Sequence, residues 1–281
     1  MDLLGTFIIN NIDIIALIIS IIGLYFVGIQ IKVANKQNRL QSDIVRRENA
    51  LKMADYFIEL IEKELGPCSL ILNENKINDV YKGTKFTDFQ YFDQAEMRSV
   101  LHLELSDMKT IYDNVEENYD ALLKGYERAT DYHDFDKKEI KILNIYSKYH
   151  WNEDEIRSNY TESDIELIID EMDFYKYKLK RCYKRTQMNL LNKLEYLSMT
   201  FNCKIADDRL VYQSLHQEFL YIVRLYYGYI VCLNSKDGKD KYFTNIIKLY
   251  NSWSKIDDDL YKKSLKTKRN AIIKSEYTTY K

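Results

Sequence analysis

Residues 14–31 read IIALIISIIGLYFVGIQI and contain no charged side chain. A helix of this length, at about 1.5 Å per residue, would measure about 27 Å, which matches the hydrocarbon thickness of a bilayer. A cleaved signal peptide is excluded, because Asp2 and Asp13 precede the segment and no basic residue does. The stretch therefore predicts one transmembrane helix, and with it the layout of the whole chain.

The charges on either side of this segment predict its orientation. Lys32, Lys36 and three arginines follow it closely, and basic residues remain on the cytoplasmic side of a membrane. We therefore expect residues 1–13 outside the cell and everything from Lys32 onward in the cytoplasm. Abundant Tyr, Ile, Lys and Asn suggest the coding bias of a low-GC bacterium, so the predicted location is the bacterial inner membrane as a single-pass protein.

Three small residues, Ala16, Ser20 and Gly23, share one face of the predicted transmembrane helix. Small residues allow two helices to approach closely in lipid, so this face is a candidate site of self-association. The alternative is that the helix is a plain anchor.

Composition predicts an all-α fold. The 281 residues include one Pro and eight Gly, far fewer turn residues than a strand-rich fold needs. The net charge of -2 gives no overall attraction for nucleic acid. We expect the transmembrane helix to continue into a juxtamembrane helix at residues 32–66, followed by one cytoplasmic helical bundle at residues 67–281.

Apolar residues continue past Lys32 at alternating spacings of four and three. This heptad seam consists of Leu40, Ile44, Leu51, Ala54, Ile58, Ile61 and Leu65. Gln37 is a polar member at its start, and Arg47 interrupts it. The spacing predicts a parallel coiled-coil stalk that joins several copies. The alternative is that the lower half packs on its own domain, because Met53 and Phe57 add a second apolar flank.

The remaining helices follow from apolar periodicity and from breaks. Gly66 and Pro67 are expected to end the juxtamembrane helix. Further helices are expected at residues 70–81, 93–113, 115–129, 137–149 and 163–199, with a turn at 131–136 and a loop or short turn at 151–160.

Residues 190–220 carry the densest pattern, LLNKLEYLSMTFNCKIADDRLVYQSLHQEFL. The first helix is expected to end near Asn202, and Asp207 or Asp208 is expected to cap the second. The pattern therefore predicts an antiparallel helical hairpin with a short connection.

This stretch resembles a group of bacterial single-span membrane proteins with a helical cytoplasmic domain, some of which look like abortive-infection or antiphage-defence components. The matching residues are Leu191, Asn192, Leu194, Glu195, Tyr196, Leu197, Ala206, Asp207, Tyr212, Gln213 and Leu215. The resemblance covers about thirty residues and the N-terminal segment. It implies an architecture and a process, and it transfers no catalytic residue.

Motifs for cofactors are missing from the sequence, and we expect no cofactor and no metal. The four cysteines, Cys68, Cys182, Cys203 and Cys232, show no metal-binding spacing and are expected to be reduced thiols. Two acidic turns next to His133 and His150 lack a defined ligand spacing.

One enzymatic alternative is a nuclease. All-helical nucleases of the HEPN type use an Arg and a His with about four to six residues between them for acid–base work on a phosphodiester. Arg128 with His133 and Arg209 with His216 fit this spacing. Only the second pair lies two helical turns apart on one helix face, so Arg209 and His216 are the candidate catalytic residues.

A basic patch is expected on the helix of residues 173–185, where basic residues alternate with tyrosines. Its members are Lys176, Lys178, Lys180, Arg181, Lys184 and Arg185. Such a surface suits nucleic acid, anionic lipid or a partner protein. The alternative is a solvated face matched to acidic neighbours. A second basic run begins at Lys262 and has the same two interpretations.

The sequence as a whole favours a membrane-anchored, self-associating helical effector or accessory protein of an antiphage defence system, acting by assembly or membrane perturbation and without catalysis. The alternatives are a membrane-tethered HEPN-like RNase that uses Arg209 and His216, and a passive membrane scaffold. The expected partners are the lipid bilayer and further copies of the chain.

Overall fold

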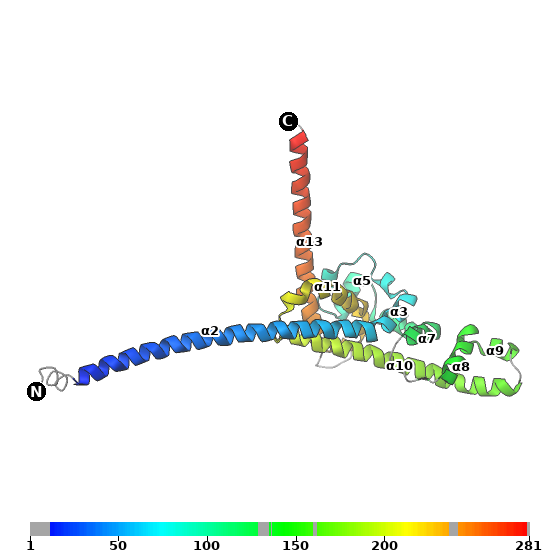
Figure 1. The fold of residues 1–281 in the computed structure, drawn as a ribbon. Helices are drawn as coiled ribbons and strands as arrows, with labels where there is room; N and C mark the ends of the chain where they lie inside the picture. Colours follow the sequence, from blue (N-terminus) through cyan, green and yellow to red (C-terminus); the bar gives the residue numbers. More distant parts are fainter. Residues whose placement is uncertain (1–11, 129–134, 136, 160–161, 236–240, 280–281) are drawn as a thin grey trace, which may run out of the picture.

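The computed structural model describes residues 12–128, 135, 137–159, 162–235 and 241–279, and side chains at residues 12–21, 128, 137–138, 162–167 and 268–279 lie outside this description. Within the described ranges every regular element is a helix (Figure 1). The predicted all-α fold class is therefore confirmed.

Helix α2 (Ile12–Leu60) is a single unbroken helix that belongs to the body only at its C-terminal end. Side chains from Ile22 to Val45 are exposed, and the first fully buried one is Ala50. At about 1.5 Å per residue, the part ahead of Arg46 extends roughly 50 Å from the body. Figure 1 shows this projecting part as the long blue helix.

The predicted transmembrane helix at residues 14–31 was wrong. In the described part of the chain, no helix combines the length and the apolar composition that crossing a membrane requires. This finding contradicts the predicted single-pass inner-membrane location.

Gly66 and Pro67 do not end the helical path, contrary to the prediction. Helix α2 passes into a π-helical turn η1 (Ile61–Leu65) and then into α3 (Gly66–Glu74). The Gly66 amide donates to the carbonyl of Ile61 in the wider π pattern. Pro67 lies in the first turn of α3, where its missing N–H removes no helical hydrogen bond.

The rest of the chain forms helices of very different lengths. They are α4 (Ile77–Val80), η2 (Phe86–Asp88), α5 (Gln94–Leu101), α6 (Leu105–Glu117), α7 (Tyr119–Arg128), α8 (Lys137–Lys148), α9 (Glu153–Asn159), α10 (Glu162–Asn202), α11 (Asp208–Leu225), α12 (Tyr227–Asn234) and α13 (Thr244–Thr279).

Several of these boundaries differ from the expected ones. The helix expected at 70–81 is divided between α3 and α4, and the helix expected at 115–129 begins at Tyr119 as α7. The helix expected at 93–113 is divided by His102, whose left-handed backbone (φ 56°) ends α5. The segment 151–160 contains α9, because the Asn152 side chain accepts the backbone N–H groups of Asp154 and Glu155 and so caps a new helix.

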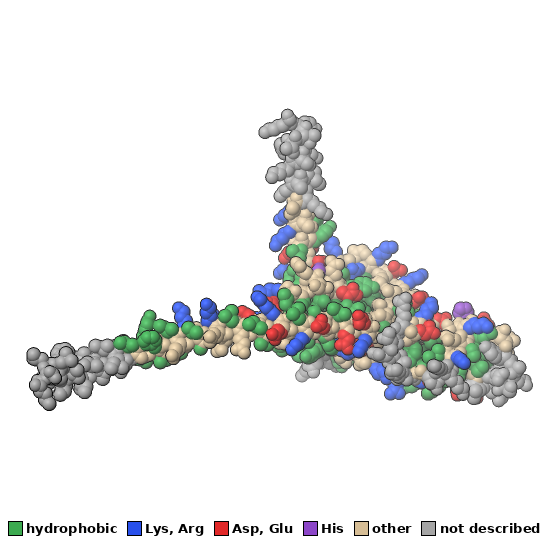
Figure 2. Space-filling view, in the orientation of Figure 1, with side chains coloured by type: hydrophobic (Ala, Val, Ile, Leu, Met, Phe, Trp, Pro, Cys, Tyr) green, Lys and Arg blue, Asp and Glu red, His purple; other side chains and the backbone are tan. Residues whose placement is uncertain are grey.

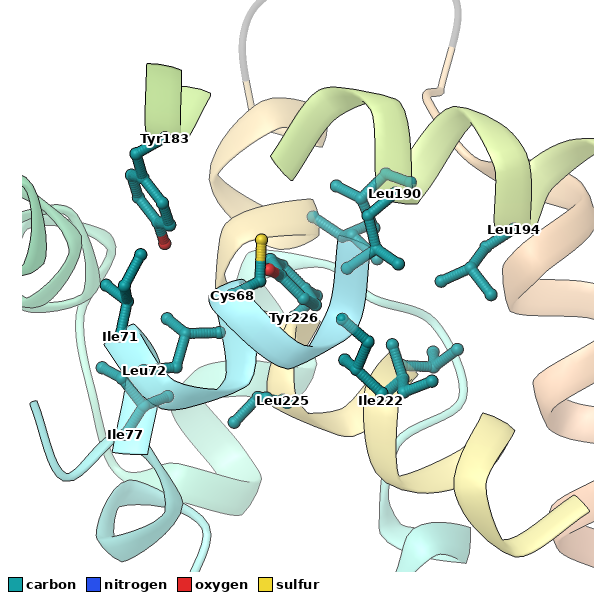
Figure 3. Close-up of a cluster of buried hydrophobic side chains, with 14 of the residues drawn as sticks. Cys68, Ile71, Leu72, Ile77, Tyr183, Leu190, Leu194, Ile222, Leu225 and Tyr226 are labelled. Atoms are coloured by element: carbon teal, nitrogen blue, oxygen red, sulfur yellow. The ribbon is translucent and has the colours of Figure 1, made fainter. Parts of the chain in front are cut away.

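Helices α3, α10 and α11 meet in one apolar core (Figure 3). Cys68 and Leu72 of α3 lie beside Leu190 of α10 and Ile222 of α11, and all four are fully buried. Helix α13 joins the same core through Trp253, whose ring packs against Phe219 at 5.1 Å between centroids. The rest of α13 projects beyond the body (Figure 1).

The connection predicted within residues 190–220 has the expected ends. Helix α10 ends at Asn202, and Asp207 caps α11 by accepting the N–H of Arg209. The main packing partners of α11 are α13 and α2. Glu195 of α10 accepts the backbone N–H groups of Asn245 and Ile246, so it fixes the start of α13.

Candidate interaction surface on helix α2

Helix α2 presents opposite environments on two faces where it crosses the body. Ala50, Phe57 and Leu60 are at most 1% exposed and pack into the core. Leu51 and Ile58, each next to a buried residue in sequence, are 57% and 50% exposed. Because successive helical residues are about 100° apart, neighbours in the sequence can face the core and the solvent.

The exposed face continues along the projecting part of α2, where exposed apolar side chains surround the helix from Ile22 to Ile31 and are confined mainly to one stripe from Val33 onward. We call this face the outer stripe; its members, each 42–58% exposed, are Ile22, Phe26, Ile29, Val33, Leu40, Ile44, Leu51 and Ile58. They fall within roughly 60° of the helix circumference. Figure 2 shows hydrophobic side chains along this helix, interspersed with Lys and Arg.

The predicted heptad seam is divided by the structure. Leu40, Ile44, Leu51 and Ile58 belong to the outer stripe. The last members, Ile61 and Leu65, lie in η1 against the core, Ile61 partly and Leu65 fully buried, while Ala54 is half-buried. The packing on the chain's own domain is therefore seen for the last members, and the coiled-coil stalk stays a prediction for the exposed members.

The sequence analysis missed the first four members of the stripe. Ile22, Phe26, Ile29 and Val33 follow the same alternation of four and three as the seam. The first three lie within the predicted transmembrane segment, and Val33 lies between that segment and Gln37, where the predicted seam begins. The spacing itself was the signal that identifies them.

Of the three small residues Ala16, Ser20 and Gly23, the structure describes the surroundings of Gly23 only. The side chains of Ala16 and Ser20 lie outside the described residues. At Gly23, no atom lies within 4 Å of the place where a Cβ would be. The structure thus places nothing from the same chain against this position.

A short loop holds α2 against the body at the point where α2 begins to project. The amide of Asp207 donates to the carbonyl of Arg46 at 3.1 Å, and the Asn49 side-chain amide donates to the carbonyl of Ile205 at 3.1 Å. Hydrogen bonds from the Arg209 guanidinium lower the pKa of the Asp207 carboxyl. The capping carboxylate is therefore ionised at neutral pH.

Charged and polar side chains lie beside the outer stripe without partners among the described residues. Gln37, Arg47 and Glu48 are exposed, and the described part of the chain contains no ion-pair partner for Arg47 or Glu48. These groups are free to pair with a molecule that covers the stripe.

The candidate catalytic residues Arg209 and His216 are engaged separately. Arg209 is 82% exposed and pairs with Asp207 at 3.0 Å. The imidazole of His216 is 12% exposed, with its Nδ1 2.8 Å from the carbonyl of Tyr212 and its Nε2 3.5 Å from Asp257. The two side chains have different partners, and of these two pairs only that of His216 with Asp257 joins α11 to α13.

The other nuclease candidate and one acidic cluster fall outside what the structure describes. His133 and its acidic neighbours at 131, 134 and 136 are not described, and neither is the side chain of Arg128. His150 is described; its Nδ1 lies 3.6 Å from Asp120. Among the described residues, no group of His, Cys, Asp and Glu could hold a metal ion.

The basic patch on α10 is matched to carboxylates from other helices. Lys178 pairs with Glu139 of α8 at 2.7 Å, and Lys184 pairs with Glu116 of α6 at 2.7 Å. Lys180 pairs with Glu117 of α6. Lys176 lies 3.8 Å from Asp173, Arg185 has a partner of its own, and Arg181 is exposed. These pairs hold α10 to its neighbours.

A polar groove lies where α13 leaves the body. Thr87 and Gln90 face Asn251, Lys255 and Asp258 around a cavity of about 470 Å³. Its charges are mixed, and Asp258 pairs with Lys262 inside the groove. Sequence reasoning gave no signal for this groove, because its two sides are far apart in the chain.

The cysteines differ in environment. Cys68 is fully buried, and burial raises the pKa of its thiol to about 12. Cys182 is also buried, Cys232 is half-buried, and Cys203 is exposed in the connection between α10 and α11. The interior thiol of Cys68 is therefore protonated and unreactive at neutral pH.

A comparison with protein-family models, with curated proteins and with solved structures found no match. The function of this chain is therefore argued from its own geometry, and the outer stripe is its most distinctive surface.

Proposed function

We propose that this chain is a non-enzymatic assembly protein, in which the outer stripe of α2 pairs with the same stripe on other copies. The observation that carries the proposal is the division of α2 into a buried face and an exposed apolar face with heptad spacing. A heptad pattern of this kind is complementary to itself, because the knobs of one helix fit the holes of another.

The projecting part of α2 gives a second reason for a partner. Helices draw most of their stability from packing of an apolar face, and this part has no packing of its own within the described chain. Large apolar side chains in a continuous exposed row are typical of interaction sites. A second copy would supply the missing contacts along the whole stripe.

The outer stripe is large enough to hold two copies together. Burying the exposed half of one such side chain is worth about 1 kcal/mol. The stripes of two copies together would therefore contribute on the order of 16 kcal/mol, which is comparable to or above the association cost of about 4–15 kcal/mol. We therefore expect the chain to self-associate in solution.

Sedimentation equilibrium of the full-length chain tests the proposal. The unchanged chain is expected to have twice the monomer mass or more. The double substitution Leu40→Glu and Ile44→Glu puts two charges into the stripe, and is expected to give the monomer mass.

Val45→Glu is the matched control. Val45 is 45% exposed and lies next to Ile44, but it points away from the stripe. Its substitution adds one carboxylate next to Ile44 on another face of the helix, and is expected to leave the mass unchanged. A monomeric unchanged chain, or equal loss of mass in both variants, would contradict the proposal.

We further propose that the assembly serves as an effector or accessory of bacterial antiphage defence. The support is the resemblance of residues 191–215 to abortive-infection components. Expression of the chain in a phage-sensitive bacterium is expected to reduce plaque formation, and Leu40→Glu with Ile44→Glu is expected to abolish that protection. Protection that survives loss of assembly would separate the two proposals.

A further inference from the structure

We infer that two copies pair through α2 in parallel and in register, with Arg47 of each copy beside Glu48 of the other and the two Gln37 side chains opposite each other. The inference rests on the proposed self-association and adds the orientation, the register and the pairing of charges. A second copy of this chain is thus the partner that the stripe fits.

Heptad positions follow from the spacing of the stripe. Gln37, Ile44, Leu51 and Ile58 occupy the a positions. The d positions begin at Val33 and recur every seven residues through Leu40, Arg47 and Ala54. Branched Ile at a positions with Leu at a d position favours two parallel strands.

Charge complementarity favours the parallel orientation. In a parallel pair, a d side chain packs beside the e position of the partner, so Arg47 meets Glu48 of the second copy twice by symmetry. Asp43 is four residues before Arg47 and lies on the same side, so the guanidinium also neutralises this carboxylate. All three residues are exposed, and the described chain contains no ion-pair partner for Arg47 or Glu48.

An antiparallel pair would place equal charges opposite each other. Its e positions face the e positions of the partner, and here they carry Glu48, Asp55 and Glu62. Like charges at facing positions are destabilising. The acidic flank of α2 therefore disfavours this orientation.

The register follows from Gln37, the polar residue at an a position beside the outer stripe. In the in-register pair the two Gln37 amides meet and satisfy each other, as a polar residue at an a position does in coiled coils. A shift of one heptad would set the Gln37 of one copy against Ile44 of the other and leave that amide without a partner, while the second Gln37 would meet Gln30. Such a buried unpaired amide is costly, so the unshifted register is preferred.

The body leaves room for this arrangement. Ala50, Phe57 and Leu60, which hold α2 to the body, lie roughly 120° around the helix from the outer stripe. Two bodies would therefore lie on the outer sides of the helix pair, away from each other.

Disulfide cross-linking of the full-length chain tests orientation and register. The exposed Cys203 is first replaced (Cys203→Ser), and Leu40→Cys or Leu51→Cys is then introduced singly. Under mild oxidation, each variant is expected to form a covalent dimer with itself, because in-register positions face each other. Val45→Cys, which points away from the stripe, is the matched control and is expected to stay uncross-linked.

Charge exchange tests the pair of Arg47 and Glu48 separately. Arg47→Glu and Glu48→Arg are each expected to weaken the dimer about tenfold or more, since each leaves like charges facing. An equimolar mixture of the two variants is expected to regain the original affinity as a heterodimer. A mixture no tighter than its components would contradict the pairing.

The outcomes distinguish this inference from the proposed function. A monomer mass for the unchanged chain overturns both. A dimer that cross-links only when Leu40→Cys and Leu51→Cys are mixed, or that does not cross-link through the stripe at all, keeps self-association and overturns the parallel register. Circular dichroism of each variant verifies that the helices are retained.

Discussion

The two ends of helix α2 have the same regular backbone and opposite surroundings. Near its C-terminal end, one face of the helix is closed by the body, with Phe57 and Leu60 each 1% exposed. Before Arg46, no face is closed, and apolar side chains such as Phe26 (58%) and Leu40 (55%) meet solvent. Helical periodicity therefore defines the apolar faces of a helix, and tertiary structure decides which of these faces is covered.

Phe57 and Ile58 are neighbours near the C-terminal end of α2, and their substitution is expected to have very different effects on stability. Phe57→Ala leaves a large cavity in the core and is expected to lower the free energy of unfolding by about 3–5 kcal/mol. Ile58→Ala, one position later, removes a side chain that is half exposed and is expected to cost less than about 1 kcal/mol in the monomer. Urea denaturation at low protein concentration measures both.

The dependence of stability on protein concentration distinguishes the role of Phe57 in the core from the proposed role of Ile58 in the dimer. The effect of Ile58→Ala is expected to grow with protein concentration, because a dimer that uses Ile58 is stabilised by mass action. The effect of Phe57→Ala is expected to stay constant. Equal losses for the two variants at every concentration would mean that α2 has one structural role only.

The outer stripe over the body gives the next largest effect. Leu51→Gln with Ile58→Gln replaces two exposed apolar side chains and is expected to weaken self-association about 100-fold, with little change in monomer stability. Sedimentation velocity across a concentration series measures the shift. Lys52→Gln with Glu59→Gln, two exposed positions on the far side of the same turns, is the matched control. An unchanged oligomeric mass in the first variant would exclude this part of the stripe from the interface.

Local pattern predicted much of the fold. The all-α class, the extents of α8 and α10, and the cap at Asp207 follow from apolar periodicity and from capping residues. Each of these features depends on residues close together in the chain. The π turn before Gly66 and the left-handed break at His102 depend on packing that no local pattern encodes.

The apolar N-terminal run shows the limit of composition as a guide. Residues 14–31 matched the length of a membrane span, yet the described helix contains no segment that qualifies as one. Within the same residues, Phe26 also fits the heptad spacing that continues through Val33 and Leu40. Composition and periodicity therefore supported different predictions for one segment, and the structure contradicts the prediction from composition.

The partners of the charged side chains were the features that the sequence predicted least well. Lys178 and Lys184 formed a basic run in the sequence, but their partners Glu139 and Glu116 come from α8 and α6, distant in the chain. Glu195 was noted only for a resemblance, and it caps α13 across the fold. Contacts of this kind become visible only when the helices are assembled.

The loop that fastens α2 at the start of its projecting part gives a smaller effect. Asp207→Ala removes a helix cap and is expected to cost about 1 kcal/mol of stability at neutral pH. The pKa of Asp207 is lowered from its ordinary value of 3.8, chiefly by the hydrogen bonds from Arg209. Its stabilisation is therefore present above pH 3.8 and is lost as the pH falls through the lowered pKa.

Thermal unfolding followed between neutral and strongly acidic pH measures this contribution. The difference between the unchanged chain and Asp207→Ala is expected to disappear in acid. Asp208→Ala is the neighbouring control, because Asp208 lies within the first turn of α11 and Asp207 is its cap. A difference that persists in acid would assign the effect to packing of the loop.

The smallest effects are expected at the residues that the nuclease alternative requires. Arg209→Ala removes an 82% exposed side chain, and its effect on stability is expected to stay within about 0.5 kcal/mol. His216→Asn keeps a polar group near the carbonyl of Tyr212 and is expected to change stability by less than about 1 kcal/mol. Neither residue lies on α2, so both variants are expected to keep the oligomeric mass and any protection against phage. Loss of protection in both variants, with assembly intact, would favour catalysis at α11 over assembly through α2. Arg209 and His216 have separate partners in this structure, so a requirement for both side chains would indicate a shared role in a reaction.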